Sequence, residues 1–181
     1  RESVAGADLN LDGDFEDDVT QLYDASGGSP VIVNLGVAAT RAAISSQIVA
    51  LVVPEADEPS ADSGDAGREQ SLLAIYEIGS LAPVAITTHI ADAVAVSGTR
   101  LVLTARELLT NVDSNGDGDL ADDYDLRIYD YVLGGGGTLT SLAHTARDFA
   151  IDGSLVAFTT REIDEGGLDL DGDGTEMAGD Y

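Results

Sequence analysis

Short apolar runs separated by small turn residues dominate the chain. Three pairs of such runs occur, at residues 43–44 and 48–51, at 93–96 and 101–104, and at 149–151 and 155–158. The segments between the runs, such as Ser-Gly-Thr and Asp-Gly-Ser, favour tight turns. Runs this short, bounded by turn residues, predict β-hairpins. No stretch combines apolar residues at helical spacing with capping residues at its ends. The pattern therefore predicts an all-β fold.

The pattern repeats along the chain at a nearly constant interval. Three tyrosines recur every 53 residues, at Tyr23, Tyr76 and Tyr129. Four glutamates recur at intervals of 53, 52 and 55 residues, at Glu2, Glu55, Glu107 and Glu162. A period this regular is typical of arrays and propellers. We interpret the tyrosines as packing residues between repeats.

Each repeat contains enough short runs for four strands. After the hairpin comes an acidic segment, then a third run ending in Tyr-Asp or Tyr-Glu, and then a fourth run such as residues 138–142, which follows the glycine run at 134–137. Four antiparallel strands in about 53 residues predict the blade of a β-propeller. The predicted division is a partial blade of outer strands at 1–41, two blades at 42–92 and 93–147, and a partial blade of inner strands at 148–181.

The chain contains a little over three repeats, fewer than the usual minimum of about four blades. The chain is therefore expected to be a fragment of a longer propeller, or one of several chains that complete a ring together. We favour the fragment. Its partners would then be the remaining blades of the same chain, and in the other case an oligomer.

Two segments carry a family resemblance. Residues 95–104 and 150–159 resemble the inner hairpin of TolB-type, WD-like β-propellers. This resemblance extends through the repeats over most of the chain. It implies a disc of blades that serves mainly for the binding of proteins or ligands.

Three acidic loops carry the main candidate chemistry. Each has Asp or Asn at alternate positions followed by Gly, which gives oxygen ligands at positions 1, 3 and 5 and a sharp turn at position 6, as calcium loops require. The first loop offers Asp8, Asn10, Asp12, Asp14, Asp17 and Asp18. The second loop offers Asp113, Asn115, Asp117, Asp119, Asp122 and Asp123. The third loop offers Asp169, Asp171, Asp173 and Asp180. The predicted cofactor is calcium.

The loops resemble EF-hand loops only in their first half. The bidentate Glu expected at position 12 is replaced by Val19, Tyr124 and Asp180 in the three loops, and predicted strands flank them. We therefore expect calcium loops between strands rather than a helix-loop-helix sensor. The competing interpretation is a solvated acidic surface of the halophilic type. Six carboxylates in residues 8–18 speak against it, because each like-charge contact costs on the order of 1 kcal/mol without a cation.

Other groups in the sequence give weaker signals. The segment at residues 62–65 lacks the alternation of acidic residues and is followed by Arg68. His89 and His144 occupy equivalent positions, where we expect structural roles. No nucleophile, zinc or phosphate-loop motif is present, and the spacing of the many acids selects no catalytic pair. The chain itself is therefore not expected to be an enzyme.

Charge and composition narrow the range of partners. The chain has 34 Asp and Glu against 8 basic residues, all Arg, for a net charge of −26. Such a surface repels nucleic acid and anionic membranes. The absence of Cys excludes disulfides and thiolate metal sites. No apolar run is long enough for membrane insertion.

Two functions fit these patterns. The first is a calcium-stabilised structural or binding module of a secreted or cell-surface protein, with a protein or carbohydrate as its ligand. An extracellular, periplasmic or cell-surface location follows from calcium sites that typically bind at about 10⁻⁴–10⁻³ M outside cells. The alternative is the non-catalytic propeller portion of a larger secreted hydrolase or other enzyme.

Overall fold

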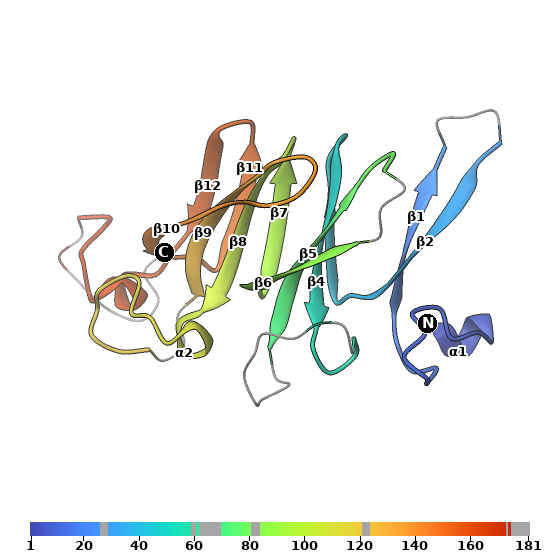
Figure 1. Cartoon of the computed structure of the whole chain (residues 1–181). Coiled ribbons are helices and arrows are strands. Elements are labelled where there is room, and N and C mark those ends of the chain that lie inside the picture. Colours follow the sequence, from blue (N-terminus) through green and yellow to red (C-terminus); the bar gives the residue numbers. More distant parts are fainter. Residues whose placement is uncertain are drawn as a thin grey trace.

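The computed structural model describes residues 1–25, 29–58, 61, 70–80, 84–120, 124–172 and 174. These residues form four antiparallel sheets, none of them closed (Figure 1). The first sheet pairs β1 (Val19–Asp24) with β2 (Val31–Ala38). The second contains β3 (Arg41–Ile44), β4 (Ile48–Pro54), β5 (Ser71–Glu77) and β6 (Ala85–Ile90) in that order. The third contains β7 (Ala93–Ser97), β8 (Arg100–Arg106), β9 (Tyr124–Tyr131) and β10 (Gly137–Thr145), and the fourth pairs β11 (Asp148–Asp152) with β12 (Leu155–Thr159).

The all-β prediction is confirmed, and the three predicted hairpins are present as β3–β4, β7–β8 and β11–β12. The last two hairpins close through two-residue turns in which Gly98 and Gly153 have positive φ angles of 62° and 59°. Such turns match the twist of the strands that they connect. The turns of neighbouring sheets also bond to each other. Ser45 Oγ donates to the Gly98 carbonyl at 2.7 Å, and Gly153 N–H donates to Ser97 Oγ at 2.9 Å.

The same backbone bond closes three successive units. In each unit, the residue that follows the last strand (β2, β6 or β10) donates its backbone N–H to a carbonyl. That carbonyl belongs to the residue at or just before the start of the preceding strand (β1, β5 or β9). These pairs are Ala39 to Asp18 at 3.2 Å, Ala91 to Ser71 at 2.9 Å, and Ala146 to Tyr124 at 2.9 Å. The acceptors are 53 residues apart, so the period of the sequence is also a period of the backbone.

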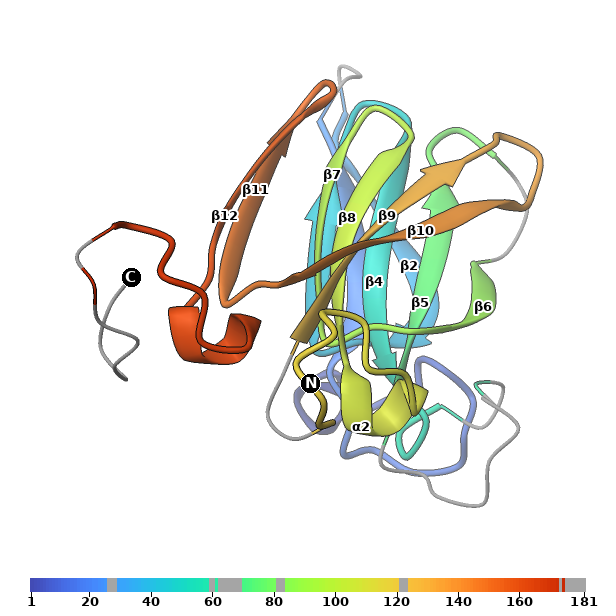
Figure 2. The same ribbon diagram turned by 90° about the vertical axis from the view of Figure 1, so that its left-hand side faces the viewer.

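The sheets pack against one another along the chain, and Figure 2 shows them one behind another. Strand β4 contributes to two cores at once. Ile48, Ala50 and Val52 pack with residues of the third sheet, whereas the alternate residues from Val49 to Val53 pack with residues of the first. Burial on both faces explains the uninterrupted apolar run in this strand.

The three repeated tyrosines differ in burial. Tyr129 is 3% exposed and contacts the His89 ring edge-on at 5.0 Å between centroids. Tyr76 is partly buried against the first two sheets, whereas Tyr23 is 63% exposed. Tyr23 lies in the first sheet, and its partner across the strands, Ile32, is exposed as well. Among the described residues, no further sheet covers this face.

Single helical turns precede β1 and follow β8 and β12. They are α1 (Glu2–Ala5), α2 (Glu107–Thr110) and the 3₁₀ turn η1 (Glu162–Glu165). The sequence predicted no helices, because one turn is too short to show helical periodicity. None of the described helices is long and apolar enough to cross a bilayer. Turns α1 and α2, with the loops that follow them, lie along the same, lower edge of the sheets in Figure 1.

Candidate metal centre

Each helical turn begins with a buried glutamate. Glu2 and Glu107 are fully buried, and Glu162 is 3% exposed. Each turn ends at a residue in the left-handed conformation, whose N–H donates to the carbonyl of the same glutamate. The chain thereby reverses within a few residues, and the acidic loop that follows returns over the glutamate side chain.

The three glutamates make the same contacts with their loops. In each case Oε1 accepts N–H groups from two successive loop residues. The donors are Leu9 and Asn10 for Glu2, Ser114 and Asn115 for Glu107, and Leu170 and Asp171 for Glu162. In each case the second oxygen, Oε2, is buried and has no hydrogen-bond partner. A bare buried carboxylate oxygen is costly, and it is the kind of ligand that a hard cation takes.

The first loop gathers further oxygens around Glu2. One carboxylate oxygen from each of Glu2, Asp12, Asp14 and Asp17 lies within 4.8 Å of the others. The Oδ1 atom of Asn10 is also buried without a partner. Burial, followed by the hydrogen bond and charge of Asp12, raises the pKa of Asp17 to about 6. Four side chains therefore place carboxylate oxygens in one small volume, and Asn10 borders it through its Nδ2, which donates to Asp17 Oδ2 at 3.2 Å. Calcium prefers six to eight oxygens, and this group supplies a large part of them.

Asp8 and Asp18 lie outside that group. Asp8 holds the backbone of the loop, because its Oδ1 accepts the Leu11 N–H at 2.6 Å and its Oδ2 accepts the Gly13 N–H at 3.1 Å. Asp18 is exposed. These two predicted ligands are therefore placed to shape and flank the loop.

The second loop repeats this arrangement. Asp113 accepts the N–H groups of Gly116 and Gly118 at 2.6 and 3.1 Å. Burial raises the pKa of Glu107, and the nearby charges of Asp113 and Asp117 raise it further. These carboxylates are close enough to repel one another, so a cation between them would relieve the repulsion.

The other predicted residues of the second loop are placed less fully. Asn115 Oδ1 accepts the Asp117 N–H at 3.2 Å, and Asp117 Oδ1 accepts the Asp119 N–H at 3.0 Å. Both bonds bend the backbone around the centre of the loop. The predicted ligands Asp122 and Asp123 lie outside the described residues.

The third loop brings together Glu162, Asp169 and Asp171, with one carboxylate oxygen of each within 4.8 Å of the others. Asp169 also accepts the N–H groups of Gly172 and Gly174 at 2.7 and 3.1 Å. The predicted ligands Asp173 and Asp180 are outside the described part of the chain.

The fourth position of each loop requires a left-handed backbone. Gly116 and Gly172 have φ angles of 82° and 80° there, and Leu11 has 66° in the first loop. A leucine in this conformation is unfavourable, and its side chain is 85% exposed. The Asp8 hydrogen bonds hold Leu11 in the same loop shape that glycine adopts in the other two loops.

No family model, curated protein or solved structure matches this chain. The geometry of the loops is therefore the basis for any functional conclusion.

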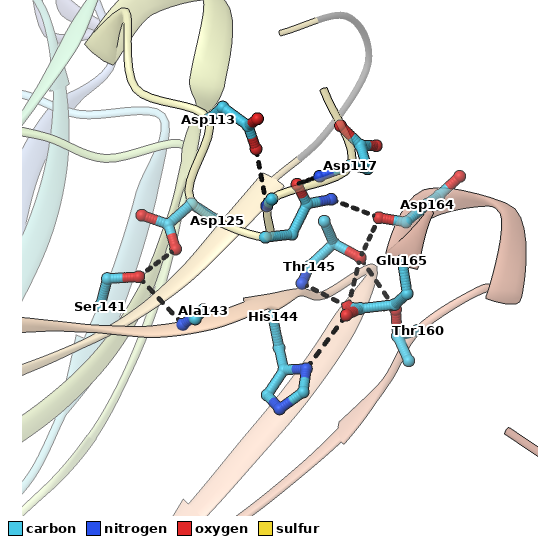
Figure 3. A network of polar contacts seen from close by, with 12 residues as sticks. Asp113, Asp117, Asp125, Ser141, Ala143, His144, Thr145, Thr160, Asp164 and Glu165 are labelled. Atoms are coloured by element: carbon cyan, nitrogen blue, oxygen red, sulfur yellow. Dashed lines mark hydrogen bonds and ion pairs between the residues drawn. The ribbon is translucent and has the colours of Figure 1, made fainter. Parts of the chain in front are cut away.

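A polar network adjoins the second loop (Figure 3), because Asn115 Nδ2 and Thr145 Oγ1 both donate to the Asp164 carbonyl, at 2.5 and 3.4 Å. The buried Glu165 accepts the Thr145 N–H at 2.7 Å, and its Oε2 lies 3.0 Å from His144 Nδ1. The His144 ring also stacks near Phe158, at 5.8 Å between centroids. Both oxygens of Glu165 have partners, so this carboxylate fastens η1 to the end of β10.

Protonation of the candidate ligand Asp17 should make the stability of the metal-free protein and its calcium affinity depend on pH. Because the pKa of Asp17 rises from 3.8 to about 6 in the folded chain, the metal-free native state holds a proton that the unfolded chain releases between these values. The stability of the metal-free protein should therefore fall as pH rises through about 4 to 6. Calcium must displace that proton, so its affinity for the first loop should drop roughly tenfold per pH unit below about 6.

Calorimetry in two buffers of different ionisation enthalpy measures the protons released on calcium binding. We expect more proton release at pH 6 than at pH 8. Equal release at both values, or a calcium affinity that does not change between pH 5 and 7.5, would contradict this assignment of Asp17.

Proposed function

We propose that the chain is a calcium-stabilised part of a β-propeller, whose four sheets are complete or partial blades. It would serve as a structural or binding module of a secreted or cell-surface protein. The four-stranded second and third sheets, packed face to face, support the blade interpretation. The recurrence of one closing backbone bond every 53 residues supports it as well.

One observation carries the calcium assignment. In all three loops a buried glutamate offers a bare Oε2 atom, and in the first and third loops that glutamate belongs to a group of converging carboxylates. Oxygen donors alone favour calcium or magnesium over zinc or copper. Magnesium demands near-ideal octahedral geometry and retains its water. Irregular loops with clustered carboxylates therefore suit calcium better.

The role that we propose for calcium is to hold the loops in place. The chain has a net charge of −26, and no Cys is available to cross-link its loops. A cation that joins a helical turn to the loop after it performs the same task without covalent chemistry. Affinities of about 10⁻⁴–10⁻³ M, typical of extracellular modules, would keep such sites filled outside cells.

Titration calorimetry with calcium tests the proposal directly. We expect saturable uptake at millimolar calcium, with little uptake of magnesium. The variant Asp117→Ala should lose the uptake of the second loop and keep that of the other two. A matched control is Asp130→Asn, because Asp130 lies on β9 and pairs with Arg100 at 2.5 Å, away from the loops. Absence of calcium uptake by the wild-type chain would overturn the proposal.

A further inference from the structure

The first two acidic loops touch the following repeat through the same side chain. Asn10 Nδ2 donates to the carbonyl of Asp57 at 3.2 Å, and Asn115 Nδ2 donates to the carbonyl of Asp164 at 2.5 Å. Both acceptors lie two residues after a repeated glutamate, Glu55 or Glu162. The contact therefore joins equivalent places in two pairs of successive repeats.

Close packing accompanies the second of these contacts. A Cβ atom added to Gly166, which ends η1, would lie 3.3 Å from Asp117 Cβ. Figure 3 shows Asp164 of this turn beside the loop that carries Asp113 and Asp117. The turn of one repeat thus lies directly against the acidic loop of the repeat before it.

These bonds fix the orientation of the asparagine amides. A backbone carbonyl only accepts hydrogen bonds, so the amide nitrogen must face it and the amide oxygen must point away from it. In the first loop the same nitrogen also donates to Asp17 Oδ2 at 3.2 Å, so the Asn10 amide links the carbonyl of the following repeat to one of the converging carboxylates. The amide oxygen is the buried Asn10 Oδ1 atom, which has no partner. It lies in the loop whose acidic group includes the fully buried Glu2, with its own bare Oε2.

We propose that the first and second cation sites each span two repeats. In each, the carbonyl of the following repeat, at Asp57 or Asp164, positions an asparagine whose oxygen binds the cation. This inference rests on the proposed function, and it adds a consequence to it. Outer partners that orient a metal ligand contribute to affinity, and the coupling is reciprocal. Calcium in one loop therefore strengthens the attachment of the next repeat.

The sequence supplies the substitution that tests this inference. The third loop has Asp171 at the position of Asn10, so the loop accommodates a carboxylate there. The variant Asn10→Asp keeps an oxygen for the cation and loses the N–H that reaches Asp57. It should still bind calcium, but the bound calcium should no longer strengthen the attachment of the next repeat. Asn10→Ala, the second variant, should lose both properties.

Hydrogen exchange of the turn at residues 54–58 provides the readout. The repeat that contains this turn lacks the alternating acidic pattern, so no calcium loop of its own is predicted to alter the exchange. The turn contains the Asp57 N–H, bonded to the Pro54 carbonyl at 3.3 Å, and the Glu55 N–H, bonded to the Gln70 carbonyl at 3.0 Å. The full chain is used in an Asp117→Ala, Asp171→Ala background, so that calorimetric calcium uptake reports the first loop.

With Asn10 present, saturating calcium should slow exchange in the turn by roughly 2- to 10-fold, the equilibrium factor of one hydrogen bond. Asn10→Asp should take up calcium without this slowing. Equal slowing in Asn10→Asp, or no slowing in the parent chain while calorimetry shows calcium bound, would overturn the inference and leave the proposed function intact. Absence of calcium uptake by the parent and by wild type would overturn both.

Discussion

EDTA is expected to lower the melting temperature of the wild-type protein by tens of degrees relative to saturating calcium. Each site that binds only the folded chain adds about 2.7 kcal/mol when calcium is at 100 times its dissociation constant. For a chain of 150–250 residues, 1 kcal/mol shifts the melting temperature by about 2–4 °C. Each occupied loop should therefore contribute roughly 5–10 °C. Circular dichroism melts in EDTA and in calcium measure the difference.

Salt separates this mechanism from a general effect of negative charge. Molar sodium chloride screens the repulsion among exposed carboxylates. It does not supply a divalent cation for the buried oxygens of Glu2, Glu107 and Glu162 to bind. Salt should therefore restore only a small part of the stability that EDTA removes, and magnesium should restore little more. A melting curve in which salt replaces calcium completely would instead favour a halophilic type of surface.

Replacement of Glu2 by Gln should maintain or raise the stability of the metal-free protein and lower its affinity for calcium. The amide oxygen can still accept the Leu9 and Asn10 N–H groups, and the amide nitrogen would face acidic groups such as Asp12 and Asp17. In EDTA the variant should melt at or above the wild-type temperature, because one charge leaves a crowded cluster. Its calcium affinity in the first loop should fall at least about tenfold, as for altered metal sites in general.

Glu55→Gln is the matched control. Glu55 is buried at the equivalent place in the repeat that lacks the acidic alternation, so the calcium response of this variant should equal that of wild type. Melting curves and calcium titrations of both variants decide the matter. If Glu2→Gln melts lower in EDTA and binds calcium normally, Glu2 serves only to hold the loop.

The strand pattern was predictable because the repeats are strongly marked in sequence. The apolar runs and their turn residues located the three hairpins, including the turn at Gly98. The exposure of Tyr23 was not predictable from its spacing with Tyr129. Equivalent residues have equivalent packing only when a neighbouring sheet covers them, and among the described residues none covers Tyr23.

The site was predictable only in part, and the missing part was the glutamates. Their interval was visible, but Glu is rarely buried, so spacing alone did not suggest that Glu2 or Glu107 faces the loop. The one-turn helix that positions each of them is also too short to leave a pattern in the sequence. Asp8, by contrast, was predicted as a ligand, and the structure adds two backbone hydrogen bonds that the sequence did not indicate.

Strand β4 has a consequence for the pathway of folding. A register shift of one residue normally exposes an apolar face to water, and that penalty selects the correct pairing. In β4 every residue from Ile48 to Val53 is apolar and buried, so a shifted pairing still buries apolar side chains on both faces. Selection must then come from the turns, where Ser45 accepts the Gln47 and Ile48 N–H groups at 3.1 Å each. We therefore expect a misregistered β4 to compete with the native pairing during folding, and changes at the Ser45 turn to affect folding more than conservative changes in the core of this strand.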